Sequence, residues 1–481
     1  MMRMRMKKRD GSGLRVAEER IPGRPRRRRH GSAGSAAALL LALGFTMAAA
    51  PVRAQGGGST ADLSRPLSVD ALVRLALDRS LLVAQAHEVE AAARGSRTSA
   101  LSGVLPSLNA TVGYTWNDNE QGAGYFNQTT GRFVNDRDSW ILDLRGDVNL
   151  LSAASWYNLS SARSGVAAAR YGASDREAEI VLAVRRQYYL LVAAQELARV
   201  ARESYDLRQE QLRRAESLFE LGSVARSDVL QAQVNLATAE RERIAAENAI
   251  VRERARLAVM LALPVDAPLE VEPPAPVQDS VTVESEEELV RRAEANLPAL
   301  QQARAEVAAA RAGERATRAQ LWPSLGLSYS YSKQEIGVAG DLAATPLKED
   351  ATWGYTVGLS APLFDGMRVR GESQRAAAER RSRERGLDAA RLDAALGVRE
   401  ARLAIRNAAE TLRSAREGVR FAEESARLQR ALYESGGGTL LEWNNAQVEL
   451  TRAQVAVVQA EAELRSAQAE LERAVGAPVN R

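Results

Sequence analysis

An internal repeat constrains this 481-residue chain more than any other feature of its sequence. Residues 218–236 and 432–450 align without gaps, 214 positions apart, and share seven of nineteen residues. Each segment stands between a long helical pattern and a shorter one. The shared glycines, Gly222 and Gly436, suit the left-handed residue that ends one helix before the next begins. We therefore predict two helical hairpin tips in a chain built from one duplicated unit.

Each half of the chain also contains one very long segment without proline. Residues 152–219 and 366–434 each read as a single helix. In the first, Val181, Val184 and Tyr188 follow the 3-4 spacing of a coiled-coil seam, which continues to Leu191. At about 1.5 Å of rise per residue, such a helix spans roughly 100 Å.

Shorter helical patterns flank each long one, and two of them end to end would match its length. We expect the first to start after Ser68 as N-cap, and the second to be capped by Ser227 or Asp228. Two short helices stacked beside each long one would form a wall of a cylinder. The four short helices are predicted over residues 68–103, 227–263, 286–321 and 440–476.

The pattern changes to strict alternation in two windows. LPSLNATVGY (residues 105–114) and WPSLGLSYSY (residues 322–331) correspond, with their prolines 217 positions apart. Apolar and polar residues alternate there, and again in strands near residues 140–150 and 353–359, which predicts four strands with one apolar face each. A polar loop is expected over residues 117–137.

Alternating segments of this length are typical of outer-membrane β-barrels, whose apolar residues face lipid and whose polar residues face the lumen. Four strands cannot close a barrel, and an open edge has no hydrogen-bond partners in lipid. Several chains must therefore share one barrel. Eight strands from a dimer would leave an interior filled by side chains, whereas twelve from a trimer could leave a pore.

The amino-terminal 54 residues are predicted to be a signal peptide. The basic run RPRRRR (residues 24–29) precedes an apolar run (residues 36–50) that is too short to span a membrane, and cleavage is expected after Ala54. A linker over residues 55–67 would follow, and a proline-rich linker over residues 264–285 would separate the two repeats.

Removing this leader reverses the charge balance. The leader holds 13 of the 65 Lys and Arg residues but 3 of the 61 Asp and Glu residues, so the remaining chain has a net charge of −6. No clustered basic face supports nucleic-acid binding. The chain contains no cysteine, and its one histidine outside the leader is His87. This composition excludes cysteine nucleophiles and histidine–cysteine metal sites.

With these features together, the chain resembles the TolC-like family of outer-membrane efflux proteins. The resemblance rests on the duplicated plan, the paired strands after the two proline motifs, and the tip motif LG-x-x-x-x-S-D-V-L-x-A-Q, and it covers Leu67 to Pro478. It implies a mainly α fold with a transmembrane β part. A trimer would form a 12-stranded β-barrel continuous with a 12-helix coiled-coil tunnel in the periplasm.

The resemblance also sets the expected domain boundaries. The first repeat would cover residues 68–263 and the second residues 286–478. Within them, the β-hairpins would occupy residues 105–151 and 321–365, and the helical tips residues 220–228 and 434–442.

The function implied is that of an outer-membrane exit duct in a tripartite efflux or type I secretion system. Such a homotrimer conducts substrates passively, receives them from an inner-membrane transporter through a periplasmic adaptor, and uses neither a cofactor nor a metal. A soluble periplasmic coiled-coil scaffold or adhesin stalk is the alternative, with the strands as a small β-cap. An exported hydrolase is a third possibility, but the sequence has no nucleophile elbow, phosphate loop or convincing carboxylate pair.

The hairpin tips are the candidate functional sites that the resemblance implies. Glu442 matches an acidic position of the gate ring, Asn445 replaces a second acidic residue, and Asp228 is the counterpart in the first repeat. Three copies of Glu442 around a narrow axis would favour cations. Alternatively, Asp228 and Glu442 are ordinary acidic residues at helix N-termini. The predicted adaptor-docking residues are Leu221, Gly222, Ser223, Val224, Ala225, Arg226, Ser227, Ser435, Gly436, Gly437, Gly438, Thr439 and Leu440.

Overall fold

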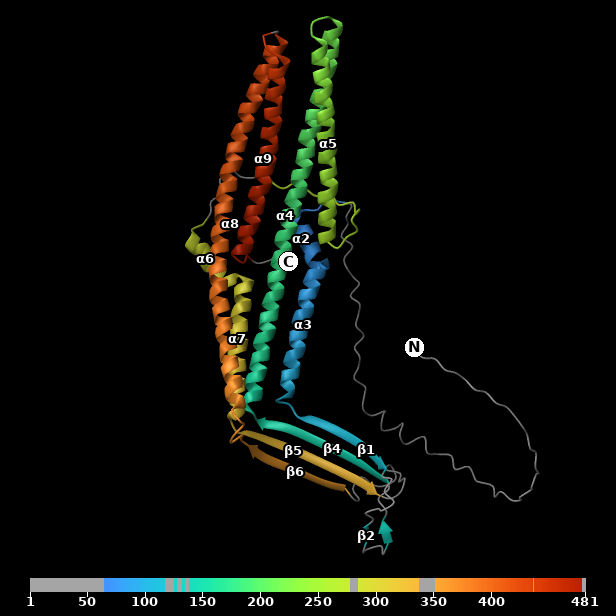
Figure 1. Cartoon of the computed structure of the whole chain (residues 1–481), viewed down its shortest axis with the longest axis vertical. Coiled ribbons are helices and arrows are strands. Elements are labelled where there is room, and N and C mark those ends of the chain that lie inside the picture. Colours follow the sequence, from blue (N-terminus) through green and yellow to red (C-terminus); the bar gives the residue numbers. More distant parts are fainter. Residues whose placement is uncertain are drawn as a thin grey trace, which may run out of the picture. The chain divides into compact units, whose positions relative to one another are not determined.

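The computed structural model describes residues 65–116, 125–127, 132–134, 138–276, 284–336, 351–435 and 437–477. The predicted signal peptide, most of the linker after it and Gly436 lie outside these residues. In the described part, helices dominate (Figure 1). A pair of strands interrupts the helices of each half, and the two pairs form one four-stranded sheet.

The helices repeat the same order in both halves. The first half has two short helices, a 68-residue helix and a final shorter helix: α2 (Val69–Arg79), α3 (Leu81–Ser102), α4 (Ala153–Glu220) and α5 (Arg226–Met260). The second half has the same series, with a 67-residue long helix: α6 (Glu286–Asn296), α7 (Pro298–Arg318) with the 3₁₀ turn η1 (Ala319–Leu321), α8 (Arg368–Glu434) and α9 (Leu440–Ala474).

The first helix of each repeat is broken in two, where the sequence predicted one continuous helix. Ser80 and Leu297, 217 positions apart, both adopt extended backbone angles. Pro298 explains the second break, because a proline disfavours helical geometry in the residue before it. Ser68 caps α2 as expected: its Oγ accepts a hydrogen bond from the Ala71 amide. Nothing in the sequence marks Ser80 comparably.

The sheet has the strand order β1 (Ser107–Trp116), β4 (Asp138–Leu151), β5 (Ser324–Ile336) and β6 (Ala351–Ser360), with every pair antiparallel. The two hairpins thus join edge to edge, and β1 and β6 are the outer strands. The residues expected to form a polar loop include a short extra pair, β2 (Tyr125–Asn127) and β3 (Arg132–Val134).

The strand register separates an apolar face from a polar one, as the alternation predicted. Residues directly opposite one another share a face of a sheet. One row across the four strands is apolar: Ala110, Leu144, Tyr331 and Trp353. The next row is polar: Thr111, Asp143, Ser332 and Thr352. Exposed apolar side chains, among them Leu108, Val112, Tyr355 and Val357, remain on this isolated sheet.

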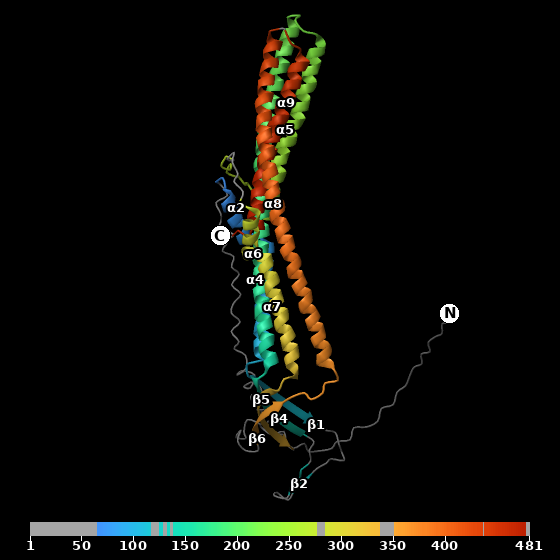
Figure 2. The same ribbon diagram turned by 90° about the vertical axis from the view of Figure 1, so that its left-hand side faces the viewer.

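The helices form a layer one helix thick (Figures 1 and 2). Near the sheet the order of contacting helices is α3, α4, α7 and α8, and toward the hairpin tips it is α5, α4, α9 and α8. The short helices therefore lie along the long ones, as their lengths predicted. Of the predicted α4 seam, Val184, Tyr188 and Leu191 are buried.

The main apolar core lies about half-way along the helices. There α2, α4 and the end of α5 pack against the segment that follows α5, which contains Leu269 and Val271. Val271 pairs with Leu67 in an isolated parallel bridge. The Tyr188 hydroxyl donates a 2.6 Å hydrogen bond to the Glu272 carbonyl. Burial raises the pKa of Tyr188 to about 12, so this donor keeps its proton.

None of the described helices combines the length and the apolar character needed to cross a membrane. In the described ranges, no cluster of histidine, cysteine and carboxylate side chains could hold a metal ion.

Candidate functional site: the hairpin tips

The tip between α4 and α5 ends its first helix as the sequence predicted. Gly222 adopts a positive φ of 74°. Its amide bonds the Phe219 carbonyl at 2.9 Å, and the Ser223 amide bonds the Leu218 carbonyl at 2.8 Å. These bonds satisfy carbonyls at the helix end that would otherwise lack partners. The turn is solvent-exposed, and Leu221 is 78% accessible.

The predicted cap of α5 was wrong. The helix begins at Arg226 and its N-cap is Ala225, which makes no side-chain capping bond. Ser227 and Asp228 lie inside the first turn, where the Ser227 hydroxyl donates to Asp228 Oδ1 at 3.3 Å. The carboxylate of Asp228 at this position still stabilises the helix through the macrodipole.

The second tip, between α8 and α9, is held by a capping box. Thr439 Oγ1 accepts the Glu442 amide at 3.2 Å, while Glu442 Oε2 accepts both the Thr439 amide and its hydroxyl at 2.9 Å. These hydrogen bonds from Thr439 lower the pKa of Glu442. The carboxylate is therefore ionised and engaged with its own turn, as the helix-terminus interpretation of Glu442 requires.

A side chain at Gly438 of this second tip would be tightly packed. A Cβ on Gly438 would lie 3.1 Å from the Cβ of Leu432 and 3.3 Å from backbone atoms beside it. The amides of Gly437 and Gly438 both bond the Leu432 carbonyl, at 2.9 and 3.1 Å. The chain thus folds back over the end of α8.

The two tips are joined by a buried polar contact that the sequence did not reveal. Arg208 of α4 is 6% exposed, and its Nη1 donates to Asn444 Oδ1 of α9 at 2.7 Å and to Gln211 Oε1 at 2.9 Å. Asn444 is itself 8% exposed, whereas the predicted Asn445 is exposed. One residue along a helix is a rotation of about 100°, so the predicted position faces away from this contact.

Further interactions near the tips connect the same two hairpins. Arg214 Nη1 of α4 contacts Glu434 Oε1 of α8 at 2.7 Å, and Arg430 contacts the same carboxylate at 3.1 Å. Hydrogen bonds from both arginines lower the pKa of Glu434. The Tyr433 ring lies 5.3 Å from that of Trp443, which is buried. Burial raises the pKa of Tyr433, and the Asp228 charge adds to the effect.

The structure therefore places the candidate residues in three settings. Asp228 lies within electrostatic reach of Tyr433 on the other hairpin, Glu442 is engaged in its own cap, and Asn445 points away from the buried contact. Of the docking residues, Leu221 is the C-cap of α4, and Leu440 is the first residue of α9, directly after the turn that follows α8. Together these tips form a hydrogen-bonded, charged end to the helical layer.

This architecture matches known proteins. The sequence profile of the family described as "Outer membrane efflux protein" matches residues 72–263 and 289–477, which include both repeats.

The chain belongs to the outer membrane efflux protein family.

Among solved structures, this efflux-family chain resembles the outer membrane protein VceC from Vibrio cholerae, with a TM-score of 0.73 over 86% of this chain and 97% of that one at 18% identity. It also resembles the CmeC channel of Campylobacter jejuni, with a TM-score of 0.71, 16% identity and 85% of both chains covered. At these identities the likeness establishes the fold.

Curated relatives match this chain at higher sequence identity than these solved structures do, but over a smaller part of its length. Protein CyaE of Bordetella pertussis is 30% identical over 49% of this chain and 48% of its own. The pyoverdine export outer membrane protein OpmQ of Pseudomonas aeruginosa is 27% identical over 64% of both chains. The alkaline protease secretion protein AprF of the same species is 29% identical over 59% of this chain and 57% of its own. The efflux-family chain thus matches about half to two thirds of the length of these relatives.

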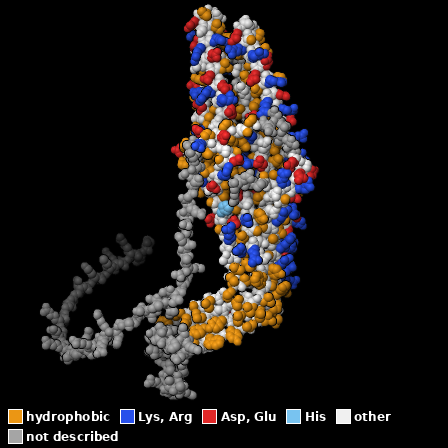
Figure 3. Space-filling view, turned by 180° about the vertical axis from the view of Figure 1, so that it is seen from behind, with side chains coloured by type: hydrophobic (Ala, Val, Ile, Leu, Met, Phe, Trp, Pro, Cys, Tyr) orange, Lys and Arg blue, Asp and Glu red, His pale blue; other side chains and the backbone are white. Residues whose placement is uncertain are grey.

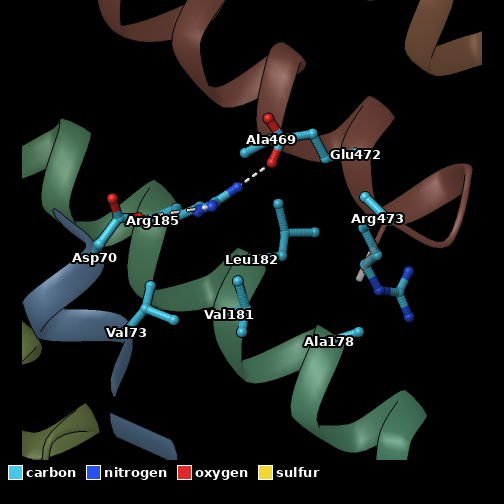
Figure 4. A pocket seen from close by; sticks show the side chains of 10 residues that line it. Asp70, Val73, Ala178, Val181, Leu182, Arg185, Ala469, Glu472 and Arg473 are labelled. Atoms are coloured by element: carbon cyan, nitrogen blue, oxygen red, sulfur yellow. Dashed lines mark hydrogen bonds and ion pairs between the residues drawn. The ribbon is translucent and has the colours of Figure 1, made fainter. Parts of the chain in front are cut away.

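A second charged site in the efflux-family chain lies about half-way along the helical layer, where α4 of the first repeat meets α9 of the second (Figure 4). A pocket of about 40 Å³ is lined by residues of α2, α4 and α9. Arg185 reaches from α4 to Glu472 of α9 and lies 3.9 Å from Asp70 of α2. Arg473 pairs with Glu179 at 3.2 Å. A pocket this small has no room for a ligand much larger than water, so these ion pairs join helices rather than bind a ligand.

Proposed function

We propose that the chain is the outer-membrane exit duct of an efflux or secretion system, open to passive flow along a shared axis. Family membership supports this function, and it favours a channel over a soluble scaffold or a hydrolase. The observation that carries the proposal furthest is the helical layer itself. A wall one helix thick encloses nothing alone, but copies placed side by side would enclose a bore.

The sheet supports assembly into a trimer. In the described part of the chain, β1 and β6 pair on one side only. Their free edges would carry unpaired backbone groups into lipid, which strongly disfavours an isolated chain there. Pairing β6 of one copy with β1 of the next would satisfy them. Three copies would give twelve strands, enough for an open lumen.

The helical edges support the same assembly. On α5, Leu230, Val234 and Val251 are exposed and follow a heptad-like spacing. On α8, Phe421, Leu428 and Leu432 are exposed in the same way. These are the two outer helices of the layer near the tips. We infer that α5 of one copy packs along α8 of the next, which would bury both apolar seams.

The tips are the proposed gate and docking region. Asp228, Glu442 and Asn445 would face the axis or its rim in three copies, and Arg208–Asn444 with Arg214–Glu434 would hold the two hairpins of each copy together. The turns over residues 221–227 and 435–440 would contact a periplasmic adaptor that leads to an inner-membrane pump. The names of the relatives include both siderophore export and protease secretion. A passive duct is compatible with either cargo.

Deletion of residues 221–227 tests the docking role. We expect the variant to form trimers in detergent and to conduct ions in planar bilayers, because the sheet and the helical seams are intact. Export by cells that depend on the channel should be lost. Normal export would refute the docking assignment. Absence of any conductance from the intact protein would refute the duct itself.

A further inference from the structure

A basic groove lies between α7 and α8, close to the sheet. It is lined by Arg318, Arg370, Ser373, Gln374, Ala377 and Arg381, with a volume of about 260 Å³. The four residues Arg370, Gln374, Ala377 and Arg381 follow a 4-3-4 spacing, so they share one face of α8. Arg318 reaches the groove from α7. Three arginines thus contribute to the lining of one depression of the surface.

The carboxylates of this region are already paired with arginines, and one of these arginines is Arg318 of the groove. Glu314 pairs with both Arg318 and Arg380, and Glu384 pairs with Arg380 and Arg311. Residues 368–385 contain seven arginines and three glutamates, a net charge of +4. Among the residues that the structure describes, Arg370 and Arg381 have no ion pair with a carboxylate. The groove therefore carries positive charge that the described protein does not neutralise.

An exposed apolar patch directly adjoins the groove. Leu363, Phe364 and Met367 precede or begin α8 and are 98%, 82% and 58% exposed. Leu321, the last residue of η1, and Trp322, which follows it, are 50% and 58% exposed. The paired residues Ser324 and Ser360 hold these two segments side by side at the edge of the sheet. Arg370 lies three residues beyond Met367, or about 5 Å along the helix.

The space-filling view from behind shows how apolar and basic side chains are distributed on one face (Figure 3). Apolar side chains cover the sheet and the adjoining helix ends. Basic side chains follow along the edge where α7 and α8 lie. An apolar band followed by a basic band is the arrangement that suits acyl chains and their phosphate groups at a membrane surface.

We propose that the groove between α7 and α8 binds the headgroup of an anionic phospholipid from the inner leaflet of the outer membrane. Arg370 contacts the phosphate nearest the hydrocarbon, Arg318 lines the same groove while paired with Glu314, and Leu363 and Phe364 lie against the acyl chains. Arg381, about 16 Å further along α8, extends the positive field over the headgroup. Guanidinium groups suit phosphate oxygens because they donate in pairs. The inference rests on the outer-membrane location but not on channel activity.

The test uses the detergent-purified full chain and native mass spectrometry, which counts bound lipids. The probes are dioleoylphosphatidylglycerol, zwitterionic dioleoylphosphatidylcholine and inorganic phosphate. The variant Arg370→Gln/Arg381→Gln removes two groove charges. The matched control, Arg375→Gln/Arg385→Gln, removes two charges from the same helix outside the groove, where both arginines already pair with carboxylates.

We expect the unaltered protein to prefer phosphatidylglycerol, and the groove variant to bind it about thirtyfold more weakly. The control should retain binding. Equal loss in both variants would overturn the proposal, because net charge alone would then explain binding. Competition by millimolar inorganic phosphate would assign the groove to free phosphate instead. Dissociation of the assembly in the groove variant would assign it to a contact between copies. If the double variant does not fold, Arg381→Gln with Arg385→Gln as control gives the same comparison.

Discussion

Arg208 and Asn444, 236 residues apart in sequence, make a buried 2.7 Å hydrogen bond between the first and the second hairpin. The donor is a guanidinium that burial deprives of water, and this burial lowers the pKa of Arg208. Arginine nevertheless stays charged at neutral pH. A buried charge needs its partner, so this contact couples the positions of the two tips.

Replacing Asn444 with Ala should therefore destabilise the tip region by about 2 kcal/mol, because it leaves the Arg208 guanidinium with fewer partners. Hydrogen exchange of the α4 and α9 ends near the tips measures the local effect. The control is Arg213→Ala, which removes an exposed arginine of the same helix that hydrogen-bonds Gln209 of its own helix. Unchanged protection from hydrogen exchange in Asn444→Ala would show that the contact does not stabilise the tip region.

The Arg214–Glu434 pair predicts a pH dependence. Two arginines lower the folded-state pKa of Glu434, so its contribution is present above the unfolded pKa of about 4.3 and is lost as pH falls through the lower folded value. Single-channel conductance should be constant from about pH 5 to pH 8 and should rise below about pH 4 as the hairpins separate. In Glu434→Gln the acid-induced rise should be absent or smaller. A rise centred near pH 6 would implicate another group.

Glu442 can be tested as a charge separately from its role as a cap. Glutamine can serve in a capping box, so Glu442→Gln should keep the start of α9 and remove only the negative charge. We expect a lower cation-to-anion permeability ratio at similar conductance in planar bilayers. Thr439→Ala is the comparison, because it removes the cap and leaves the charge. An unchanged permeability ratio in Glu442→Gln would remove this residue from the proposed gate ring.

The inferred packing of α5 on α8 predicts a specific cross-link. The chain has no cysteine, so introduced ones stand alone. Oxidation of Val234→Cys/Leu428→Cys should give covalent trimers on non-reducing gels, because both positions lie near the tips on exposed seams. The control pairs Val234→Cys with Leu392→Cys, about 54 Å further along α8. Equal cross-linking in the control would contradict the proposed interface.

The backbone conformation of Gly476, far from the tips, predicts that substitution there destabilises the fold. Its φ is +68°, and an added Cβ would lie 2.7 Å from the backbone of Asn296 and Leu297. Gly476→Ala should lower the free energy of unfolding by about 1–3 kcal/mol. Gly371→Ala in α8, where nothing lies within 4 Å, should instead stabilise by up to about 1 kcal/mol. Denaturant titration of both variants measures the difference.

Periodicity predicted the long helices and the four strands because each is a local property of the sequence. The break at Leu297 could also have been predicted from Pro298. The break at Ser80 follows no comparable local signal. It occupies the corresponding place in the first repeat, where a short helix must pack into the core around Tyr188 and Leu269.

At the tips too, features set by neighbouring residues could be predicted from the sequence, whereas contacts between distant residues could not. The capping box was readable from Thr439 and Glu442, which stand three residues apart. Arg208 and Gln211 follow the 3-4 spacing of buried positions on α4, so the sequence marks them as unusual polar residues in a seam. The partner of Arg208 on α9 is Asn444. This pairing depends on how the two hairpins approach each other, and no local sequence pattern encodes that approach.

The single thickness of the helical layer has a consequence for how the protein is made. With so little interior of its own, one copy would gain much of its stability from the proposed assembly. The free energy of folding would then depend on protein concentration, and dilution would act as a denaturant. Newly exported chains should therefore remain sensitive to proteases until enough of them gather in the membrane.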